Sequence, residues 1–216
     1  MNPKLSEQFF VRDNEEKDFG VLIDLTYRCA LECPRCQRQE FFRDHGEKVW
    51  GEDIPLDTIE KATDTFKAIN FGGQLSDPIH HPHFIEILKL CYNKGVHANI
   101  ATASTGKPKS WFIKAFEANP NARWQFGIDG LPEESHKYRV NQDGQKLFDI
   151  MCEAKNYLNK TPRWQYIVFK YNEEHIEQAK FMAKEKGLHF VVMQSHRWRG
   201  DDDPYLPSKE YRLETL

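Results

Sequence analysis

Three cysteines lie close together near the start of the chain: Cys29, Cys33 and Cys36. Thiolates bind zinc and iron–sulfur clusters, so this Cys-x-x-x-Cys-x-x-Cys spacing predicts a metal-binding loop. The sequence nearby offers no obvious fourth ligand, whereas a structural zinc site takes four. A cluster held by three cysteines keeps one iron open, as a reactive site requires. We therefore expect a reactive cluster, with structural zinc or an ordinary electron-transfer cluster as the alternatives.

The composition of the chain limits the class of protein. Its 216 residues suffice for one compact domain, and 39% of them are hydrophobic, enough to form a core. The net charge of -3 argues against a polybasic nucleic-acid binder. No apolar run approaches the ~20 residues of a membrane span, and the N-terminus MNPKLSEQFF lacks the apolar stretch of a signal peptide. We expect a cytoplasmic protein without a membrane or nucleic-acid partner.

That compartment also bears on the five cysteines. Disulfides are rare in the cytosol, so three clustered cysteines there indicate metal binding or catalysis. Cys91 and Cys152 stand alone in apolar helical patterns, and we expect both to serve as small hydrophobic residues.

Short β-rich runs alternate with amphipathic helical stretches along the chain. Such alternation indicates βαβ units and a parallel sheet. The expected strands are Val21–Thr26, Ala68–Phe71, Val96–Thr102, Trp124–Ile128, Gln165–Lys170 and His189–Gln194. The expected helices are Leu56–Lys67, Pro82–Asn93, Lys109–Ala118, Gln145–Asn159 and Glu173–Lys186.

Several residues mark where these helices should begin and end. Asp57 is expected to cap the first helix with Glu60 three residues on, and Gly95 and Gly187 are expected to end two others. Residues 37–55 are expected to form a long loop.

Six such strands allow either an open doubly wound sheet or a partial barrel. A full eight-unit barrel takes about 250 residues, so six units need about 190. We expect an N-terminal extension over residues 1–19, the α/β unit over 20–199 and a C-terminal tail over 200–216. The clustered cysteines directly follow the expected strand Val21–Thr26, and in either architecture ligands and chemistry gather at the carboxyl ends of parallel strands.

Several segments together resemble the radical S-adenosylmethionine (radical SAM) superfamily, and they occur in that family's order. The resemblance is to the core domain of its peptide-modifying SPASM/twitch-type members. The segments that carry it are Cys29-Ala30-Leu31-Glu32-Cys33-Pro34-Arg35-Cys36, Phe71-Gly72-Gly73-Gln74 with His81-Pro82, Ile128-Asp129-Gly130 with Arg139, and Asn172.

This resemblance implies a partial (β/α)6 TIM-type barrel with parallel strands. It implies that Cys29, Cys33 and Cys36 are catalytic ligands of a [4Fe-4S] cluster whose fourth iron binds S-adenosylmethionine. Reductive cleavage of that cofactor gives a 5'-deoxyadenosyl radical, which abstracts hydrogen from the substrate. A flavodoxin- or ferredoxin-type protein is the implied reductant. The expected cofactor-binding residues are Gly72, Gly73, Gln74, Thr102, Ser104, Asp129, Arg139, Asn172 and Gln194.

Four positions depart from the family's pattern. Gln74 stands where the motif has glutamate, so its carbonyl can accept a hydrogen bond but carries no charge. Arg35 replaces a frequent aromatic residue before the third cysteine. Gly127 and Ala103 stand at positions where serine and asparagine are usual.

The resemblance of residues 128–130 and Arg139 favours members that modify peptides or proteins, and we expect a peptide or small-molecule substrate. Many peptide-modifying members carry auxiliary clusters, yet no cysteine follows Cys152, so the protein works with one cluster or an extension lies outside these residues. The alternatives are a nucleoside- or deazapurine-type enzyme, a glycyl-radical activase, and a non-catalytic iron–sulfur redox sensor. Candidates for substrate contact are His45, Trp50, His196 and Trp198.

One short sequence occurs twice. Arg123-Trp124-Gln125-Phe126 and Arg163-Trp164-Gln165-Tyr166 each open an expected strand. If both arginine–tryptophan pairs lie at the N-terminal ends of strands, they belong to the stabilising end of a barrel and not to its reactive end.

Overall fold

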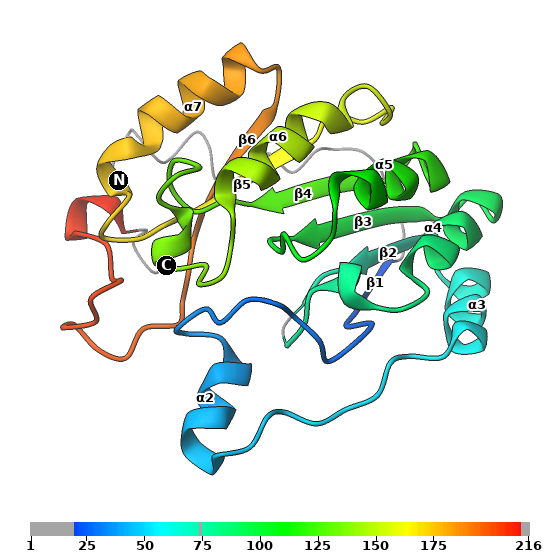
Figure 1. Ribbon diagram of the computed structural model, residues 1–216, viewed down its shortest axis with the longest axis horizontal. Helices are drawn as coiled ribbons and strands as arrows, with labels where there is room; N and C mark the ends of the chain where they lie inside the picture. The colour runs from blue at the N-terminus through cyan, green and yellow to red at the C-terminus, as the bar shows by residue number, and fades with distance from the viewer. Residues whose placement is uncertain (1–19, 74, 213–216) are drawn as a thin grey trace.

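A computed structural model describes residues 20–73 and 75–212 of the chain. Six strands form one sheet in the order β1-β2-β3-β4-β5-β6, and every neighbouring pair is parallel (Figure 1). The chain is therefore an α/β protein with the strand arrangement of a partial barrel. The strands are β1 Gly20–Ile23, β2 Ala68–Phe71, β3 His97–Thr102, β4 Arg123–Gly127, β5 Arg163–Val168 and β6 His189–Gln194.

Helices connect these strands and cover one face of the sheet (Figure 1). The sequence pattern placed most of them within a few residues of their observed bounds. The helices are α2 Gln37–His45, α3 Leu56–Thr65, α4 Phe84–Asn93, α5 Lys109–Ala118, α6 Gly144–Ala154 and α7 Ile176–Glu185.

The ends of the helices agree with the sequence in some places and not in others. Gly95 and Gly187 follow α4 and α7 with φ of +65° and +63°, which confirms both predicted stops. The predicted Asp57 cap is wrong, because α3 begins at Leu56 and Pro55 precedes it without a side-chain cap.

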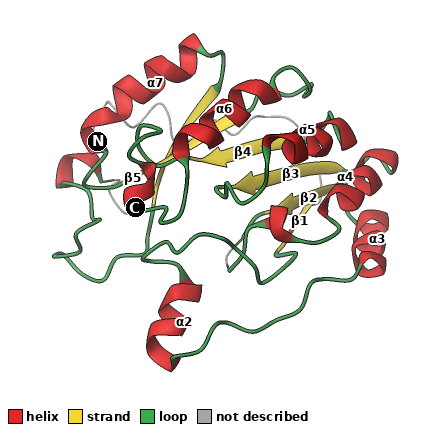
Figure 2. Cartoon of the chain, viewed as in Figure 1, coloured by secondary structure: helices red, strands yellow, loops and turns green. Residues whose placement is uncertain are grey.

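The predicted loop over residues 37–55 is also wrong in its first half, which forms α2. Figure 2 shows this helix standing apart from the sheet, joined to α3 by an extended segment. None of its residues is buried, so the hydrophobic periodicity by which a helix is recognised is missing.

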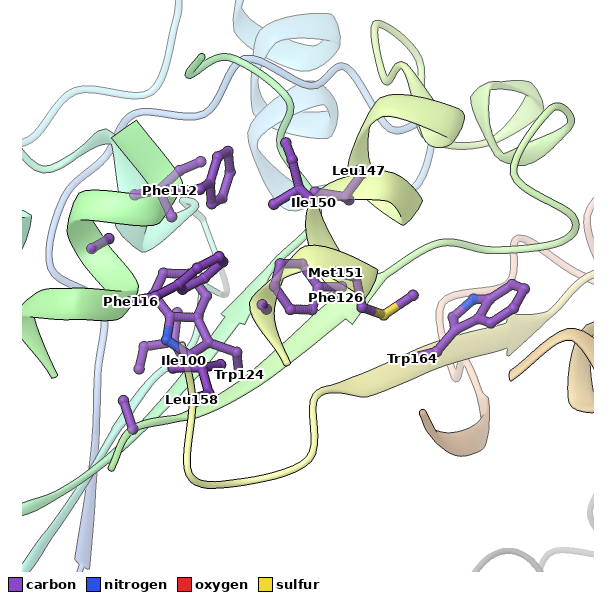
Figure 3. Close-up of a cluster of buried hydrophobic side chains, with 14 of the residues drawn as sticks. Ile100, Phe112, Phe116, Trp124, Phe126, Leu147, Ile150, Met151, Leu158 and Trp164 are labelled. Atoms are coloured by element: carbon purple, nitrogen blue, oxygen red, sulfur yellow. The ribbon is translucent and has the colours of Figure 1, made fainter. Parts of the chain in front are cut away.

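Aromatic and aliphatic side chains fill the space between the sheet and its helices. In Figure 3, Phe112 and Phe116 of α5 lie beside Trp124 and Phe126 of β4, with Trp164 of β5 farther along the sheet. The rings of Phe116 and Trp124 meet edge to face at 5.0 Å. Both Trp124 and Trp164 are fully buried, so the helix-facing side of the sheet is the main hydrophobic core.

The opposite face of the sheet is polar and only partly covered. Side chains alternate between the two faces of a strand, so the neighbours of the buried tryptophans point to the inner side of the barrel. There Gln125 Nε2 donates to Gln165 Oε1 at 2.6 Å, and Asn99 Nδ2 donates to Asn70 Oδ1 at 2.9 Å. In residues 20–73 and 75–212, no helix is both long and apolar enough to cross a membrane.

Candidate active site

A cavity of about 470 Å³ lies at the carboxyl ends of the strands. Its volume is within the range of small-molecule sites. All three clustered cysteines line it, together with residues from four of the strands and the segments after them. The described lining residues include Cys29, Cys33, Cys36, Arg38, Gly73, Thr102, Gln125, Arg139, Gln165 and Gln194.

The cysteine loop, residues 29–36, is held by hydrogen bonds to its backbone. Arg38 donates from Nη1 to the Cys29 carbonyl at 3.1 Å and from Nη2 to the Leu31 carbonyl. The Glu32 N–H donates to the Val140 carbonyl at 3.1 Å, which ties the loop to the far side of the cavity. These contacts fix the backbone, and the cysteine sulfurs remain at the cavity wall.

Burial raises the pKa of two of the thiols, and the charges beside them add to this rise at one thiol and oppose it at the other. Burial raises the pKa of the Cys29 thiol to about 12, and the Asp77 carboxylate adds to that rise. Burial also raises the pKa of Cys33, but Arg139 opposes it, with Nη1 3.9 Å from the Cys33 sulfur. Binding of a metal by Cys29 and Cys33 would have to overcome these raised pKa values, because a metal ligand is the deprotonated thiolate.

Asp77 is the polar centre of the site's floor, and the sequence motifs did not reveal it. Its carboxylate accepts hydrogen bonds from the Thr102 hydroxyl and from the Ala103 and Ser104 N–H groups at 2.9–3.0 Å. Its own N–H donates to the Arg28 carbonyl at 3.0 Å, beside the cysteine loop. One buried residue therefore links the end of β3, through its side chain, to residue 28, through its backbone. The only signal in the sequence was a helix-capping one, since Asp77 also accepts from the Ile79 N–H.

The glycine segment after β2 is held in a similar way by Asp24. The Asp24 carboxylate accepts from the Leu75 N–H at 3.2 Å and from the Ser76 hydroxyl. A Cβ on Gly73 would lie 1.6 Å from the Ser76 carbonyl oxygen, so glycine is required there. This segment therefore brings bare backbone to the cavity wall.

Arg139 and Asp129 form a buried ion pair at the other side of the cavity. Arg139 Nε donates to Asp129 Oδ2 at 2.6 Å, and the Ile167 N–H donates to the other carboxylate oxygen at 2.8 Å. Burial raises the pKa of the Asp129 carboxyl, and the Arg139 guanidinium opposes that rise. Asp129 thus orients Arg139, whose second nitrogen faces Cys33.

Comparison with known proteins gives a consistent result. The chain matches no model of a known protein family. SuiB of Streptococcus suis, solved with S-adenosylmethionine, superimposes at a TM-score of 0.66 and 15% identity over 88% of this chain and 43% of SuiB. The enzyme anSMEcpe with bound S-adenosylmethionine superimposes at a TM-score of 0.64 and 15% identity over 89% of this chain and 57% of that protein. The fold is that of the radical SAM enzymes.

Two further comparisons bear on the extent of the likeness. SuiB has also been solved bound to its precursor peptide SuiA, and that structure superimposes at a TM-score of 0.66 and 14% identity over 82% of this chain and 39% of SuiB. A tungsten-containing aldehyde ferredoxin oxidoreductase cofactor-modifying protein of Pyrococcus furiosus is 29% identical over 86 residues, which is 39% of this chain and 24% of that protein. The chain spans about a quarter of this curated relative and about half of the solved radical SAM structures.

The donor set suits the cluster that radical SAM enzymes use. Sulfurs around one zinc ion lie about 3.8 Å apart, given Zn–S bonds of about 2.3 Å. Among the described residues, no three histidine, cysteine, aspartate or glutamate side chains converge on a single metal ion. The three cysteines instead share the wall of a larger cavity. Arg38 Nε is buried there and has no hydrogen-bond partner among the described residues. Its N–H is therefore an unused donor beside the cysteine loop.

The structure places the described members of the predicted radical SAM cofactor residues in three kinds of position. Most of them line the main cavity. Gly72 lines a second cavity below it, and Ser104, Asp129 and Asn172 are buried behind the walls. Gln74 lies outside the described residues. The group that lines the main cavity is Cys29, Cys33, Cys36, Gly73, Thr102, Arg139 and Gln194.

Asn172 and Ser104 make local contacts. Asn172 Oδ1 accepts from the Phe169 N–H at 2.7 Å, and its Nδ2 donates to the Ile167 carbonyl at 3.0 Å. This turn ends β5 at Val168, two residues earlier than the sequence predicted. Ser104 Oγ lies 2.8 Å from His80 Nε2. Their roles as cofactor contacts stay predictions.

Two of the four departures from the radical SAM pattern, Gly127 and Ala103, lie side by side on the cavity wall. A Cβ on Gly127 would lie 3.2 Å from the Ala103 Cβ and 3.3 Å from Arg139 Nη2. The two small residues therefore leave room for Arg139 at the cavity wall.

The candidates for substrate contact separate in the same way. His196 lines the cavity, whereas Trp50 is 82% exposed and does not line it. His45 stacks on Phe41 at the end of α2. Trp198 packs edge to face on Phe169, 5.9 Å between centroids.

The segment after β6 packs against the cysteine loop. Asp203 accepts from Arg35 Nε at 2.8 Å and from the Arg199 and Tyr205 N–H groups. The Arg35 guanidinium also lies over the Tyr205 ring, 5.6 Å from its centroid. The residue that departs from the usual aromatic position is thus fixed by a contact 168 positions away in sequence.

Proposed function

We propose that this protein is a radical SAM enzyme that holds one [4Fe-4S] cluster on Cys29, Cys33 and Cys36. The observation that carries the proposal is the single cavity that these cysteines share with Gly73 and Arg139 at the carboxyl ends of the strands. The radical SAM fold adds support, since two solved neighbours that share it, SuiB and anSMEcpe, have been solved with S-adenosylmethionine bound. When bound, the two cofactors supply reductive cleavage of a carbon–sulfur bond and removal of a hydrogen atom from the substrate.

The protein's own residues would prepare the site for that chemistry. The guanidiniums of Arg38 and Arg139 lie beside the cysteine loop and balance the negative charge of deprotonated thiols. The bare backbone at Gly73 allows close approach of a ligand. Gln194, at the end of β6, offers an amide on the opposite wall. We expect Gln74 to accept a hydrogen bond from the amino group of S-adenosylmethionine.

Anaerobic reconstitution with iron and sulfide tests the cluster. The wild-type protein is expected to turn brown and, when reduced with S-adenosylmethionine present, to release 5'-deoxyadenosine and methionine. Alanine at position 29, 33 or 36 is expected to abolish the colour, because an open cluster with two thiolates is poorly held. Cys152→Ala removes a partly buried cysteine outside the cavity and serves as the matched control.

Two outcomes would contradict parts of this proposal. A brown chromophore that persists in all three cysteine variants would mean that other residues hold the cluster. An intact cluster that neither binds nor cleaves S-adenosylmethionine would favour the redox-sensor alternative.

We propose a peptide or protein as the substrate class. The support is the fold shared with SuiB, which has been solved bound to a precursor peptide. The test measures 5'-deoxyadenosine yield in the presence of macromolecular and small-molecule fractions of a cell extract. We expect the macromolecular fraction to raise the yield of 5'-deoxyadenosine, and we expect protease treatment of that fraction to abolish this increase. Stimulation confined to the small-molecule fraction would favour a nucleoside-type substrate.

We propose a flavodoxin- or ferredoxin-type protein as the electron donor. The cluster needs one electron for each cleavage, and a protein donor is expected to replace dithionite in the reconstituted assay. If dithionite supports turnover but none of the tested flavodoxins and ferredoxins does, the proposed electron donor is wrong.

A further inference from the structure

A second cavity lies at the other end of the barrel interior, and the proposed function does not use it. Its volume is about 280 Å³. Two arginines and three side-chain amides line it, and none of its described lining residues is acidic. The polar members are Asn70, Asn99, Arg123, Gln125 and Arg163.

The repeated Arg-Trp-Gln sequence builds this cavity. Its tryptophans, Trp124 and Trp164, are buried on the helix side of the sheet (Figure 3). Alternation along the strand therefore directs Arg123, Gln125 and Arg163 to the inner side. The repeat places both arginines at the first residue of a strand, at the end away from the cysteines. The sequence predicted a stabilising role for that end of the barrel. A pair of inward-facing guanidiniums indicates a binding role in addition.

The register brings the two arginines within reach of one small group. Gln125 and Arg163 are direct neighbours across β4 and β5, so Arg123 is the diagonal neighbour of Arg163 on the same face. With strands about 4.8 Å apart and a rise of about 3.3 Å per residue, their Cα atoms lie about 8 Å apart. Two long side chains at that separation can converge on one anion. Both arginines already have interactions, and each guanidinium offers five donors.

From this arrangement we propose that the second cavity is a binding site for an oxyanion, which is a carboxylate or phosphate group held by Arg123 and Arg163. Arginine suits such groups because its planar fork donates two parallel hydrogen bonds to them. The amides of Asn70 and Asn99, themselves joined at 2.9 Å, add donors at the side of the site. Gln125 lines both cavities, so the oxyanion site adjoins the proposed reaction chamber.

The oxyanion can come from two sources. One is a free ligand, and the other is this chain, whose sequence carries Asp13, Glu15, Glu16 and Asp18 shortly before β1. Those four residues lie outside the described part of the chain. The chemistry of recognition is the same for both sources, so the experiment has an arm for each.

The test titrates the full-length protein with inorganic phosphate against chloride at constant ionic strength and follows the melting temperature. A ligand that binds the folded state raises the melting temperature in a saturable way. The wild-type protein is expected to respond, and the apparent affinity of Arg123→Gln/Arg163→Gln is expected to fall at least tenfold. Lys89→Gln/Lys114→Gln removes two exposed charges from α4 and α5 and is expected to match the wild type.

The second arm neutralises the four acidic residues as Asp13→Asn, Glu15→Gln, Glu16→Gln and Asp18→Asn. An unchanged phosphate affinity assigns the site to a free ligand. A tenfold or larger gain assigns it to the chain's own carboxylates. An equal response in the arginine and lysine double variants would overturn the proposal, as would no response in both the wild-type and the neutralised protein. If the arginine double variant fails to fold, Arg163→Lys replaces it, with weaker phosphate binding expected because lysine keeps the charge but loses the fork.

Discussion

The two faces of the sheet differ in chemistry although the same strands build them. On the helix side, Trp124, Phe126 and Trp164 are fully buried among other apolar side chains. On the inner side, Gln125 and Gln165 bond to each other and line the main cavity. A shift of one residue along the strand changes the surroundings from a dry core to a polar chamber. The outer face therefore stabilises the fold, and the inner face is available for binding.

Substitution of neighbouring residues tests this difference most directly. Trp124→Ala leaves a large void among Phe116 and Phe126, so we expect the free energy of unfolding to fall by about 3–5 kcal/mol. Gln125→Ala, one residue along, is expected to lower it by less than about 1 kcal/mol. Urea denaturation of both variants measures the two losses. Equal losses would show that the inner face also carries the fold.

Asp77 is an exception to this division, because it is polar, buried and structural. Asp77→Ala leaves the Thr102 hydroxyl and the Ala103 and Ser104 N–H groups without their acceptor. We expect a loss of about 3 kcal/mol in urea denaturation, together with weaker retention of the cluster. Thr102→Val removes one of these donors and is expected to cost about 1 kcal/mol. A loss in Asp77→Ala no larger than that in Thr102→Val would mean that water replaces the carboxylate.

The small residues of the inner face offer a finer test. Gly127→Ser adds atoms within 3.3 Å of Arg139 Nη2 and Ala103 Cβ, so we expect a loss of about 1–2 kcal/mol in stability. The same crowding is expected to weaken binding of S-adenosylmethionine by the reconstituted protein. Gly127→Ala adds only the Cβ and should show smaller values of both effects. Tighter cofactor binding in the serine variant would contradict the assignment of this space to Arg139.

The smallest expected effect lies after β5, where the buried Glu173 pairs with the exposed Lys170. Burial opposes ionisation of Glu173, but Lys170 and two hydrogen bonds from Ser208 outweigh it and lower the pKa of this carboxyl. A depressed pKa stabilises the fold above the unfolded value of about 4.5, and that stability is lost as the pH falls through the folded pKa. Glu173→Gln is therefore expected to lose at most about 1 kcal/mol at pH 7 and to match the wild type at acid pH. A difference between the two that is the same at both pH values would exclude the ionised carboxyl as its cause.

The sequence predicted the outer face better than the inner one. Apolar periodicity identified β2, β6, α5 and most of the other elements, because their buried residues repeat at the spacing of a strand or helix. It missed α2, which buries none of its residues. The early end of β5 depends on the side chain of Asn172, which no periodicity reveals.

The candidate site divides along similar lines. The cysteines and Arg139 were found because they stand in short motifs, and the structure brings them to one cavity. Asp77, Gln125 and Gln165 were missed because their partners belong to other strands. Asp77 binds residues about 25 positions away, and Gln125 binds a residue 40 positions away. Such contacts follow from the register of the sheet, which the sequence alone did not specify.

The order of the strands also governs how the protein is made. Neighbours in the sheet are neighbours in the chain, so each new β–α unit can add to the edge already formed during synthesis. The cysteines are translated well before His196 and Arg197, which also line the cavity. At about 5–20 residues per second, roughly 10–30 s pass between translation of the cysteines and translation of the segment that completes the cavity. During that interval the proposed cluster site lacks its last wall, so the order of the strands alone leaves the cysteines accessible while the rest of the sheet is made.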